Sequence, residues 1–225
     1  MNAAAAALRM SLRTAPRHIA KSQFTSIYAP AFACRAYSAT PVDNGIFETI
    51  KKDHAELKQY FETIMKSQDP DEQVRYQNQF TWELARHSIG EEIVVYPAME
   101  KHVLNGKEMA EKDRQQHRAV KEALYKFQKL TPDQPEFKPT LQELWNNLGQ
   151  HIEEEERDDL VALEKALPDG DSVDMAKSFD RTKMFVPTRS HPSSPDRPPF
   201  ETVMGLMAAP IDKVMDMFRK FPQDK

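Results

Sequence analysis

The sequence predicts an all-α protein built as an antiparallel up-down-up-down four-helix bundle, with a targeting arm before it and a helical extension after it. No stretch sustains the alternation of period two that is typical of strands, and glycine is scarce, with six in 225 residues. Between residues 44 and 167, four stretches repeat apolar residues at spacings of three and four. Short connections between them favour antiparallel neighbours.

The first two helices are expected on either side of SQDPDE, residues 67–72, which interrupts the pattern. The inward stripe of the first helix contains Phe47, Ile50, His54, Leu57, Phe61 and Ile64. The stripe of the second contains Phe80, Leu84, His87, Glu91, Val94 and Ala98. Pro97 is expected to bend the second helix, and Asn105 with Gly106 is typical of a helix C-cap.

The third and fourth helices follow the same rule. The third stripe contains Ala110, Asp113, His117, Val120, Leu124 and Phe127, and TPDQPEFKP at 131–139 ends it. The fourth contains Leu141, Leu144, Leu148, His151 and Glu155. Pro168 to Gly170 stops the fourth helix, so the bundle is predicted to span residues 44–167.

Residues 1–37 are predicted to be a mitochondrial presequence that is cleaved. Five basic residues and no acidic residue precede Asp43, and Ala, Ser and Thr dominate the rest. Arg35 stands two residues before a plausible cut after Tyr37, so the mature chain would begin near Ser38 and lie in the mitochondrion, in the matrix. A basic arm without a targeting role is the alternative. The single cysteine, Cys34, would be removed, which leaves no cysteine for a disulfide or a metal.

Charge argues against a nucleic-acid partner, and hydropathy argues against a transmembrane segment. Removing the five positive charges would take the formal net charge from -4 to about -9, which argues against a nucleic-acid partner. No run of eighteen apolar residues occurs, so no transmembrane segment is predicted.

Residues 168–225 are predicted to form a Pro-rich linker followed by short amphipathic helices. PTRSHPSSPDRPP at 187–199 should run as an extended strap. Beyond it, a helical stripe contains Val203, Met207, Ile211, Val214 and Phe218, and Pro210 should begin a second short helix. The favoured interpretation docks this stripe on the bundle; a partner protein or a membrane surface are the alternatives.

Polar residues on the inward stripes suggest a metal site. Each predicted helix contributes one histidine, and Glu91 and Glu155 follow His87 and His151 at a spacing of four, about 6 Å apart on one helix face. An unpaired buried carboxylate costs several kcal/mol and therefore needs a cation or a strong partner. The predicted ligands are His54, His87, Glu91, His117, His151 and Glu155. Nitrogen and oxygen donors of this kind suit iron, manganese or zinc.

The heights of these residues in the bundle largely agree. Counting residues to each loop places His54 level with His87, and His117 level with His151. The connection from His87 to His117 is lopsided, so the region from Pro97 to Gly106 must absorb the excess. His102 lies about 22 Å along the helix from His87, too far for the same centre. Tyr96, Trp82 and Trp145 are interpreted as packing residues, with support of a ligand as the alternative for Tyr96.

Four segments in order resemble the motifs of hemerythrin-like, or HHE, domains. These are KKDHAEL around His54, HSIGEEIVVYP from His87, QQHRAVKEAL around His117 and HIEEEERDDLVAL from His151. The likeness covers about residues 44–167, and the extensions resemble those of mitochondrial fungal members. The resemblance implies a centre of two non-haem irons, with Glu91 and Glu155 as bridges and the four histidines as terminal ligands.

One position departs from the oxygen-carrying members of that family. These have a fifth ligand histidine four residues before the one that matches His117, and here Asp113 occupies that place. Lys121, four residues after His117, is a poor ligand while charged. Either Asp113 or water would complete the coordination of one iron. This departure argues against simple oxygen carriage.

Three functions stay open at this point. The leading one is a mitochondrial di-iron protein that binds oxygen, nitric oxide or iron itself. The second is a redox enzyme, such as a peroxidase, oxidase or ferroxidase, that uses the same centre. The third is a structural bundle in which the histidines form hydrogen bonds without metal.

Overall fold

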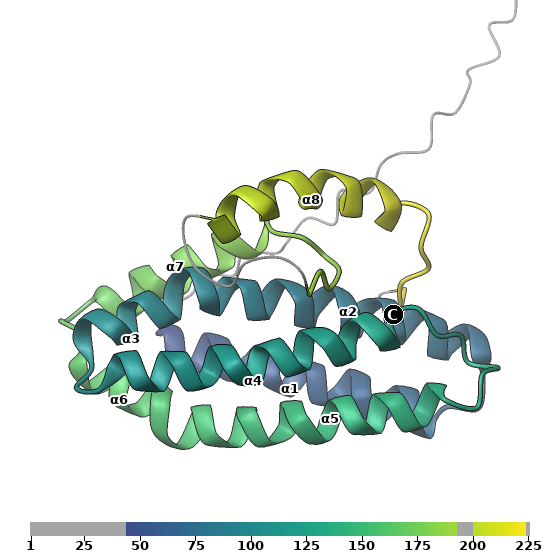
Figure 1. Ribbon diagram of the computed structural model, residues 1–225, viewed down its shortest axis with the longest axis horizontal. Helices are drawn as coiled ribbons and strands as arrows, with labels where there is room; N and C mark the ends of the chain where they lie inside the picture. Colours follow the sequence, from purple (N-terminus) through teal and green to yellow (C-terminus); the bar gives the residue numbers. More distant parts are fainter. Residues whose placement is uncertain (1–43, 193–199, 224–225) are drawn as a thin grey trace, which may run out of the picture. The chain divides into compact units, whose positions relative to one another are not determined.

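The amphipathic stripes pack as four helical rods in the computed structural model, which describes residues 44–192 and 200–223, with the backbone alone for 200–207 (Figure 1). The described part is helical and contains no strand, as predicted. The rods are α1 (Ile46–Lys66); α2 (Pro70–Gly90), the π-helical turn η1 (Glu91–Val95) and α3 (Tyr96–His102); α4 (Gly106–Phe127); and α5 (Phe137–Glu154), the π-helical turn η2 (Glu155–Asp159) and α6 (Leu160–Ala166). The predicted presequence, residues 1–37, lies outside the described residues.

The rods close into a bundle through neighbouring pairs. α1 packs along α2, α3 along α4, and α4 along α5, while α5 and α6 return to α1. Because consecutive rods that are joined by short loops lie side by side, their directions alternate.

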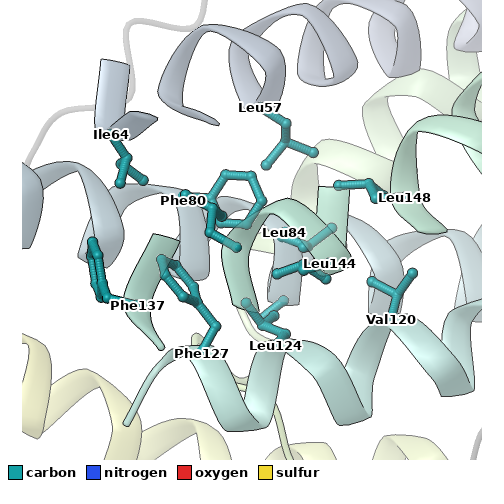
Figure 2. Packing of buried hydrophobic residues seen from close by; sticks show 12 residues of the cluster. Leu57, Ile64, Phe80, Leu84, Val120, Leu124, Phe127, Phe137, Leu144 and Leu148 are labelled. Atoms are coloured by element: carbon teal, nitrogen blue, oxygen red, sulfur yellow. The ribbon is translucent and has the colours of Figure 1, made fainter. Parts of the chain in front are cut away.

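The bundle interior has two apolar layers with a polar layer between them. Figure 2 shows part of the first apolar layer, in which leucine and phenylalanine side chains from all four rods meet. The second layer is built around Ile46, Ile50, Val95, Tyr96, Met99, Leu160 and Leu163. Each fully buried side chain of this size contributes about 1.5–3 kcal/mol to folding. These contributions offset the cost of burying the polar layer, which consists of the six predicted metal ligands.

The helix breaks are shorter than predicted. α2 already begins at Pro70, because proline is compatible with the first turn of a helix, and the Asp69 side chain caps it by accepting from the Asp71 backbone N–H at 3.0 Å. α5 begins at Phe137, whose buried side chain holds the start of the helix in the core.

The connection after α3 also differs from the prediction. α3 ends at His102, and Asn105 rather than Gly106 adopts the left-handed conformation, with φ of 61°. Gly106 instead begins α4 and faces the preceding helix, where a Cβ atom would lie 1.9 Å from the Met99 carbonyl oxygen. The glycine is therefore required by the close approach of two backbones.

We expect Gly106→Ala to destabilise the protein by about 3 kcal/mol or more, since the added methyl group can be accommodated only by moving α3 away from α4. Gly170→Ala is the matched control: its φ is 86°, but no described atom lies within 4 Å of the added carbon. That variant should cost about 1–2 kcal/mol from backbone strain alone. Urea unfolding measures the stability of both variants. Equal losses of stability would contradict the close approach of the two backbones.

Two π-helical turns change which residues face the core. The sequence analysis placed Val94 and Ala98 inward, but both are only half-buried, whereas Val95, Tyr96 and Met99 are buried. A π-helical turn inserts one extra residue, so the inward stripe shifts by one position after Glu91. More residues separate His87 from the following loop than separate that loop from His117. The extra residue of the π-helical turn and the early end of α3 compensate for this difference. Pro97 lies in the first turn of α3, directly after η1.

A further helix, α7 (Asp171–Lys183), was missed by the sequence analysis, which ended the bundle at residue 167. It packs against α1, α2 and η1, and it buries Ala176, Phe179 and Lys183. Its inward stripe is short and ends in a lysine, so its periodicity alone did not indicate a core helix.

The described side chains of the C-terminal stripe are exposed rather than docked on the bundle. α8 (Phe200–Asp216) is a single helix with Pro210 inside it, and Ile211, Val214 and Phe218 are exposed by 67%, 55% and 79%. The side chains of Val203 and Met207 lie outside the described residues. None of the described helices is long and apolar enough to cross a membrane.

Polar contacts hold α8 instead. The predicted strap is buried at residues 187–190, where the backbone N–H groups of Thr188 and Arg189 donate to the buried carboxylate of Asp212 on α8, each at 3.2 Å. Ser190 ties the strap to α4 by donating to the Lys121 carbonyl at 2.6 Å.

Candidate metal centre

The structure brings all six predicted ligands into the polar layer. Each is at most 3% exposed. They come from all four rods: His54 from α1, His87 from α2 with Glu91 from η1, His117 from α4, and His151 from α5 with Glu155 from η2. Both acids stand at the first residue of a π-helical turn, a deviation that occurs often at functional sites.

The ligand atoms form two groups that share one carboxylate. His54, His87 and Glu91 form one group and Glu91, His117 and His151 the other, with the ligand atoms of each group within 4.8 Å of one another. Glu91 Oε1 lies 3.1 Å from His87 Nε2, and Glu91 Oε2 lies 3.3 Å from His117 Nε2. The carboxylate thus presents one oxygen to each group, which is how a bridge between two cations is arranged.

Glu155 spans the two groups from the opposite rod. Its Oε2 lies 3.5 Å from His54 Nε2 and 3.8 Å from His151 Nε2. Glu155 therefore faces one histidine of each group, but through a single oxygen, and it belongs to neither of the two groups, whereas Glu91 belongs to both.

Each histidine is oriented by an oxygen from the neighbouring rod. Because a carboxylate or amide oxygen accepts, Nδ1–H donates, and Nε2 is the nitrogen that faces the centre of the layer, where it can bind a cation once it carries no proton. The pairs are His54 with Glu156 at 2.9 Å, His87 with Asp53 at 3.2 Å, His117 with Glu92 at 3.2 Å and His151 with Gln116 at 2.9 Å. These contacts run in one direction around the bundle.

Sequence reasoning missed these four supporting residues, although a signal existed. Each is the direct sequence neighbour of a predicted ligand, as Asp53 is of His54 and Glu92 is of Glu91. A residue beside an inward ligand points toward the next rod of a bundle, where it can reach the histidine of that rod.

The inner atoms of the layer fit a cation. Among the described residues, no hydrogen bond is made by His54 Nε2, His87 Nε2 or any carboxylate oxygen of Glu91 and Glu155. His117 Nε2 and His151 Nε2 face each other at 3.0 Å, which places two lone pairs together when both Nδ1 atoms carry the protons. Buried polar atoms without partners are costly, and a cation between them would satisfy both nitrogen and oxygen.

The two carboxyl groups differ in their electrostatics without a cation. Burial and the Glu91 carboxylate raise the pKa of Glu155 well above its ordinary value. Burial also acts to raise the pKa of Glu91, but the imidazoles of His87 and His117 overcome it and hold that pKa well below the ordinary value. The metal-free layer therefore carries one ionised and one protonated carboxyl group, and a metal must displace protons to bind.

Tyr96 also touches the site, although the sequence analysis favoured a packing role. Its hydroxyl lies 2.9 Å from His117 Nε2. Burial and the charge of Glu91 raise the pKa of Tyr96 well above 10, so the hydroxyl keeps its proton at neutral pH.

Asp113, at the position of the missing fifth histidine, is buried beside the layer but belongs to neither ligand group. Neither of its carboxylate oxygens has a hydrogen-bond partner within the described part of the chain. Burial and the charge of Asp159 raise the pKa of Asp113 to about 7. Lys121 forms an ion pair with Glu92 and belongs to neither ligand group.

Asp113→Asn should change how the stability of the metal-free protein depends on pH. The unfolded carboxyl group ionises near pH 3.8 and the folded one near 7, so wild-type stability falls as pH rises between these values. Relative to wild type, the variant should gain on the order of 3 kcal/mol between pH 4 and pH 8. Denaturant unfolding with a chelator at several pH values measures this difference; parallel pH profiles would contradict it.

Fold and site together define a class: an all-α bundle protein whose buried histidine and glutamate cluster is compatible with binding a metal. The family model described as hemerythrin HHE cation binding domain matches residues 45–163. The chain is also 55% identical over 188 residues to an uncharacterized hemerythrin-like protein of Schizosaccharomyces pombe, a match that covers 83% of this chain and 91% of that relative. The chain therefore belongs to the hemerythrin HHE cation-binding domain family.

Two weaker similarities were found. The crystal structure of a hemerythrin HHE cation binding domain-containing protein from Mycobacterium kansasii has the same fold, with a TM-score of 0.54 and 19% identity over 63% of this chain and 88% of that one. A protein of Nostoc sp. named as a DNA nickase is 26% identical over 147 residues, which cover 65% of this chain and 41% of that relative.

Proposed function

We propose that this protein holds two non-haem irons in its polar layer and uses them to bind oxygen, nitric oxide or iron itself. The observation that carries the proposal is the sharing of Glu91 between two histidine groups, one oxygen to each. His54 and His87 would hold one iron and His117 and His151 the other. Glu155 would form the second bridge, because it faces one histidine of each group.

The donor set supports iron, with manganese and zinc as the substitutes that it also suits. When bound, the irons would supply redox chemistry and open positions for a small ligand. The chain's own residues orient the four imidazoles through their Nδ1 atoms and exclude bulk water with an apolar layer on either side. The Tyr96 hydroxyl, in contact with His117, keeps its proton and can donate a hydrogen bond at this end of the layer.

Metal analysis combined with optical spectra tests the proposal. Protein loaded anaerobically with ferrous iron should retain two irons per chain, and its spectrum should change on adding oxygen or nitric oxide. Loading with zinc and manganese in parallel shows which metal the site prefers. Protein that retains no stoichiometric metal would favour the purely structural bundle, and many turnovers with peroxide or ferrous iron would favour the redox enzyme.

We further propose that the protein acts in the mitochondrion. The basic, acid-free composition of residues 1–37 supports this, and the match to the family model begins only at residue 45. The mature protein isolated from mitochondria should begin near Ser38. A chain that still begins at Met1, or that is absent from mitochondria, would refute the proposal.

A further inference from the structure

A buried lysine from α7 reaches toward the metal ligand His87. Lys183, the last residue of α7, is 1% exposed, and its ammonium group forms an ion pair with the carboxylate of Asp53. The family match ends at residue 163, so this contact comes from outside the matched domain. A buried ammonium group is costly unless it is paired, so the site must supply charges that hold it.

The oxygen that pairs with Lys183 is the one that supports His87. Asp53 Oδ2 receives the ammonium group and also lies 3.2 Å from His87 Nδ1. His87 Nε2 in turn faces Glu91 at 3.1 Å. A continuous chain of polar contacts therefore connects α7 with the shared carboxylate of the centre.

Contacts with α2 hold the end of α7 in the position from which Lys183 reaches Asp53. The Phe179 ring lies 5.9 Å from the His87 ring, centroid to centroid, and it packs so closely on Gly90 that an added Cβ atom there would lie 2.7 Å from Phe179. Arg86 donates to the Lys183 carbonyl at 3.4 Å and pairs with Glu83 at 2.7 Å. Glu83 also lies 3.5 Å from the ammonium group of Lys183.

The second histidine group contains a parallel arrangement. Lys121 pairs with Glu92, whose other oxygen lies 3.2 Å from His117 Nδ1. Each group thus has one histidine supported by a carboxylate that is itself neutralised by a lysine. For His117 the lysine comes from α4, inside the matched domain, whereas for His87 it comes from α7.

We propose that Lys183 is a positioning residue that tunes His87 as a metal ligand through Asp53, so that α7 adjusts the centre from outside the family domain. The inference rests on the proposed iron function. A carboxylate that accepts the Nδ1 proton makes an imidazole a stronger donor to metal. The lysine draws negative charge from that carboxylate and weakens this effect. A weaker donor favours ferrous over ferric iron, so Lys183 raises the midpoint potential of the iron near His87.

Two substitutions in the full chain test the proposal because their expected effects have opposite signs. Lys183→Met exposes His87 to the full charge of Asp53, so the midpoint potential should fall and the ferric-to-ferrous ratio at a fixed potential should rise about tenfold. Asp53→Asn removes that charge, so the potential should rise, and metal affinity should fall about 10–100-fold. The double variant should lie near wild type in midpoint potential.

Lys177→Met is the matched control. Lys177 is an exposed lysine on α7, and its ammonium group forms an ion pair at 3.0 Å with Asp174 on the same helix. Its midpoint potential should equal that of wild type, and so should that of Lys183→Arg, which keeps the charge. If Lys183→Met does not fold, Lys183→Gln takes its place, and the double variant, which removes both charges of the Lys183–Asp53 pair, is compared with it.

The outcomes separate this inference from the iron function on which it rests. Wild type that retains two irons, with equal potentials for the lysine variants and the control, overturns the inference alone. Shifts of the same sign for Lys183→Met and Asp53→Asn also overturn it, because they would indicate general damage to the layer. Wild type that retains no iron overturns the proposed function and this inference with it.

Discussion

Replacing Glu91 and Glu155 together with glutamine should abolish most of the stability that iron gives to the protein, while the metal-free bundle keeps a stability near that of wild type. Glutamine has nearly the size of glutamate but no charge, so the apolar layers are unaffected. The two carboxylates are the only proposed ligands that face both histidine groups, so neither group would retain its bridges.

The single variants Glu91→Gln and Glu155→Gln should change the stability of the metal-free protein in opposite directions. Glu155 is held protonated by burial and by Glu91, so an amide at this position removes a carboxyl group that the fold disfavours in its charged form. Its pKa is raised on folding, so Glu155 costs stability as pH rises above its unfolded value, and Glu155→Gln should stabilise at neutral pH. Glu91 is ionised against His87 and His117, so Glu91→Gln should destabilise.

Thermal melts with and without anaerobic ferrous iron measure these effects. A metal that binds the native state alone stabilises wild type by about 4 kcal/mol when its concentration is a thousand times the dissociation constant. The control is Glu122→Gln with Glu153→Gln, two exposed acids on the same rods as His117 and His151. The di-iron proposal is wrong if wild type gains nothing from iron, or if the double variant at 91 and 155 gains as much.

His87→Ala and His151→Ala should each lower the iron content from about two per chain to one or fewer. Each removes the histidine of a His/Glu pair, and the shared Glu91 links the loss in one group to the other. His102→Ala is the matched control, because His102 lies on the same rod as His87 but outside the polar layer. Iron analysis of the purified variants decides the matter: unchanged stoichiometry in both ligand variants would rule out the site.

The sequence alone determined the class of fold and the six members of the polar layer. The inward stripes are local patterns, repeated every three or four residues along one helix, so His54 and Glu91 could be assigned to the core without knowledge of any other helix. Glu155 was distinguished from the acids beside it by the same register. Counting residues to each loop placed His54 level with His87 and His117 level with His151, but left the connection from His87 to His117 lopsided.

The tertiary structure alone decided how the layer is supported. Asp53 reaches His87, and Glu156 reaches His54, from positions 34 and 102 residues away, so the position of each beside a predicted ligand does not by itself tell which histidine it meets. The π-helical turns that moved Tyr96 into contact with His117 depend equally on packing between rods.

The C-terminal part shows the limit of periodicity most clearly. The apolar stripe has the pattern of a docked helix, yet Ile211 and Val214 on α8 and Phe218 beyond its end are exposed, while Asp212 on α8 binds the buried strap. In α7, a lysine occupies a core position because Asp53 and Glu83, distant in sequence, neutralise it there. Periodicity reports which face of a helix is apolar, but the partner that a face meets is set by charges and hydrogen bonds from other segments, and these exist only once the chain has folded.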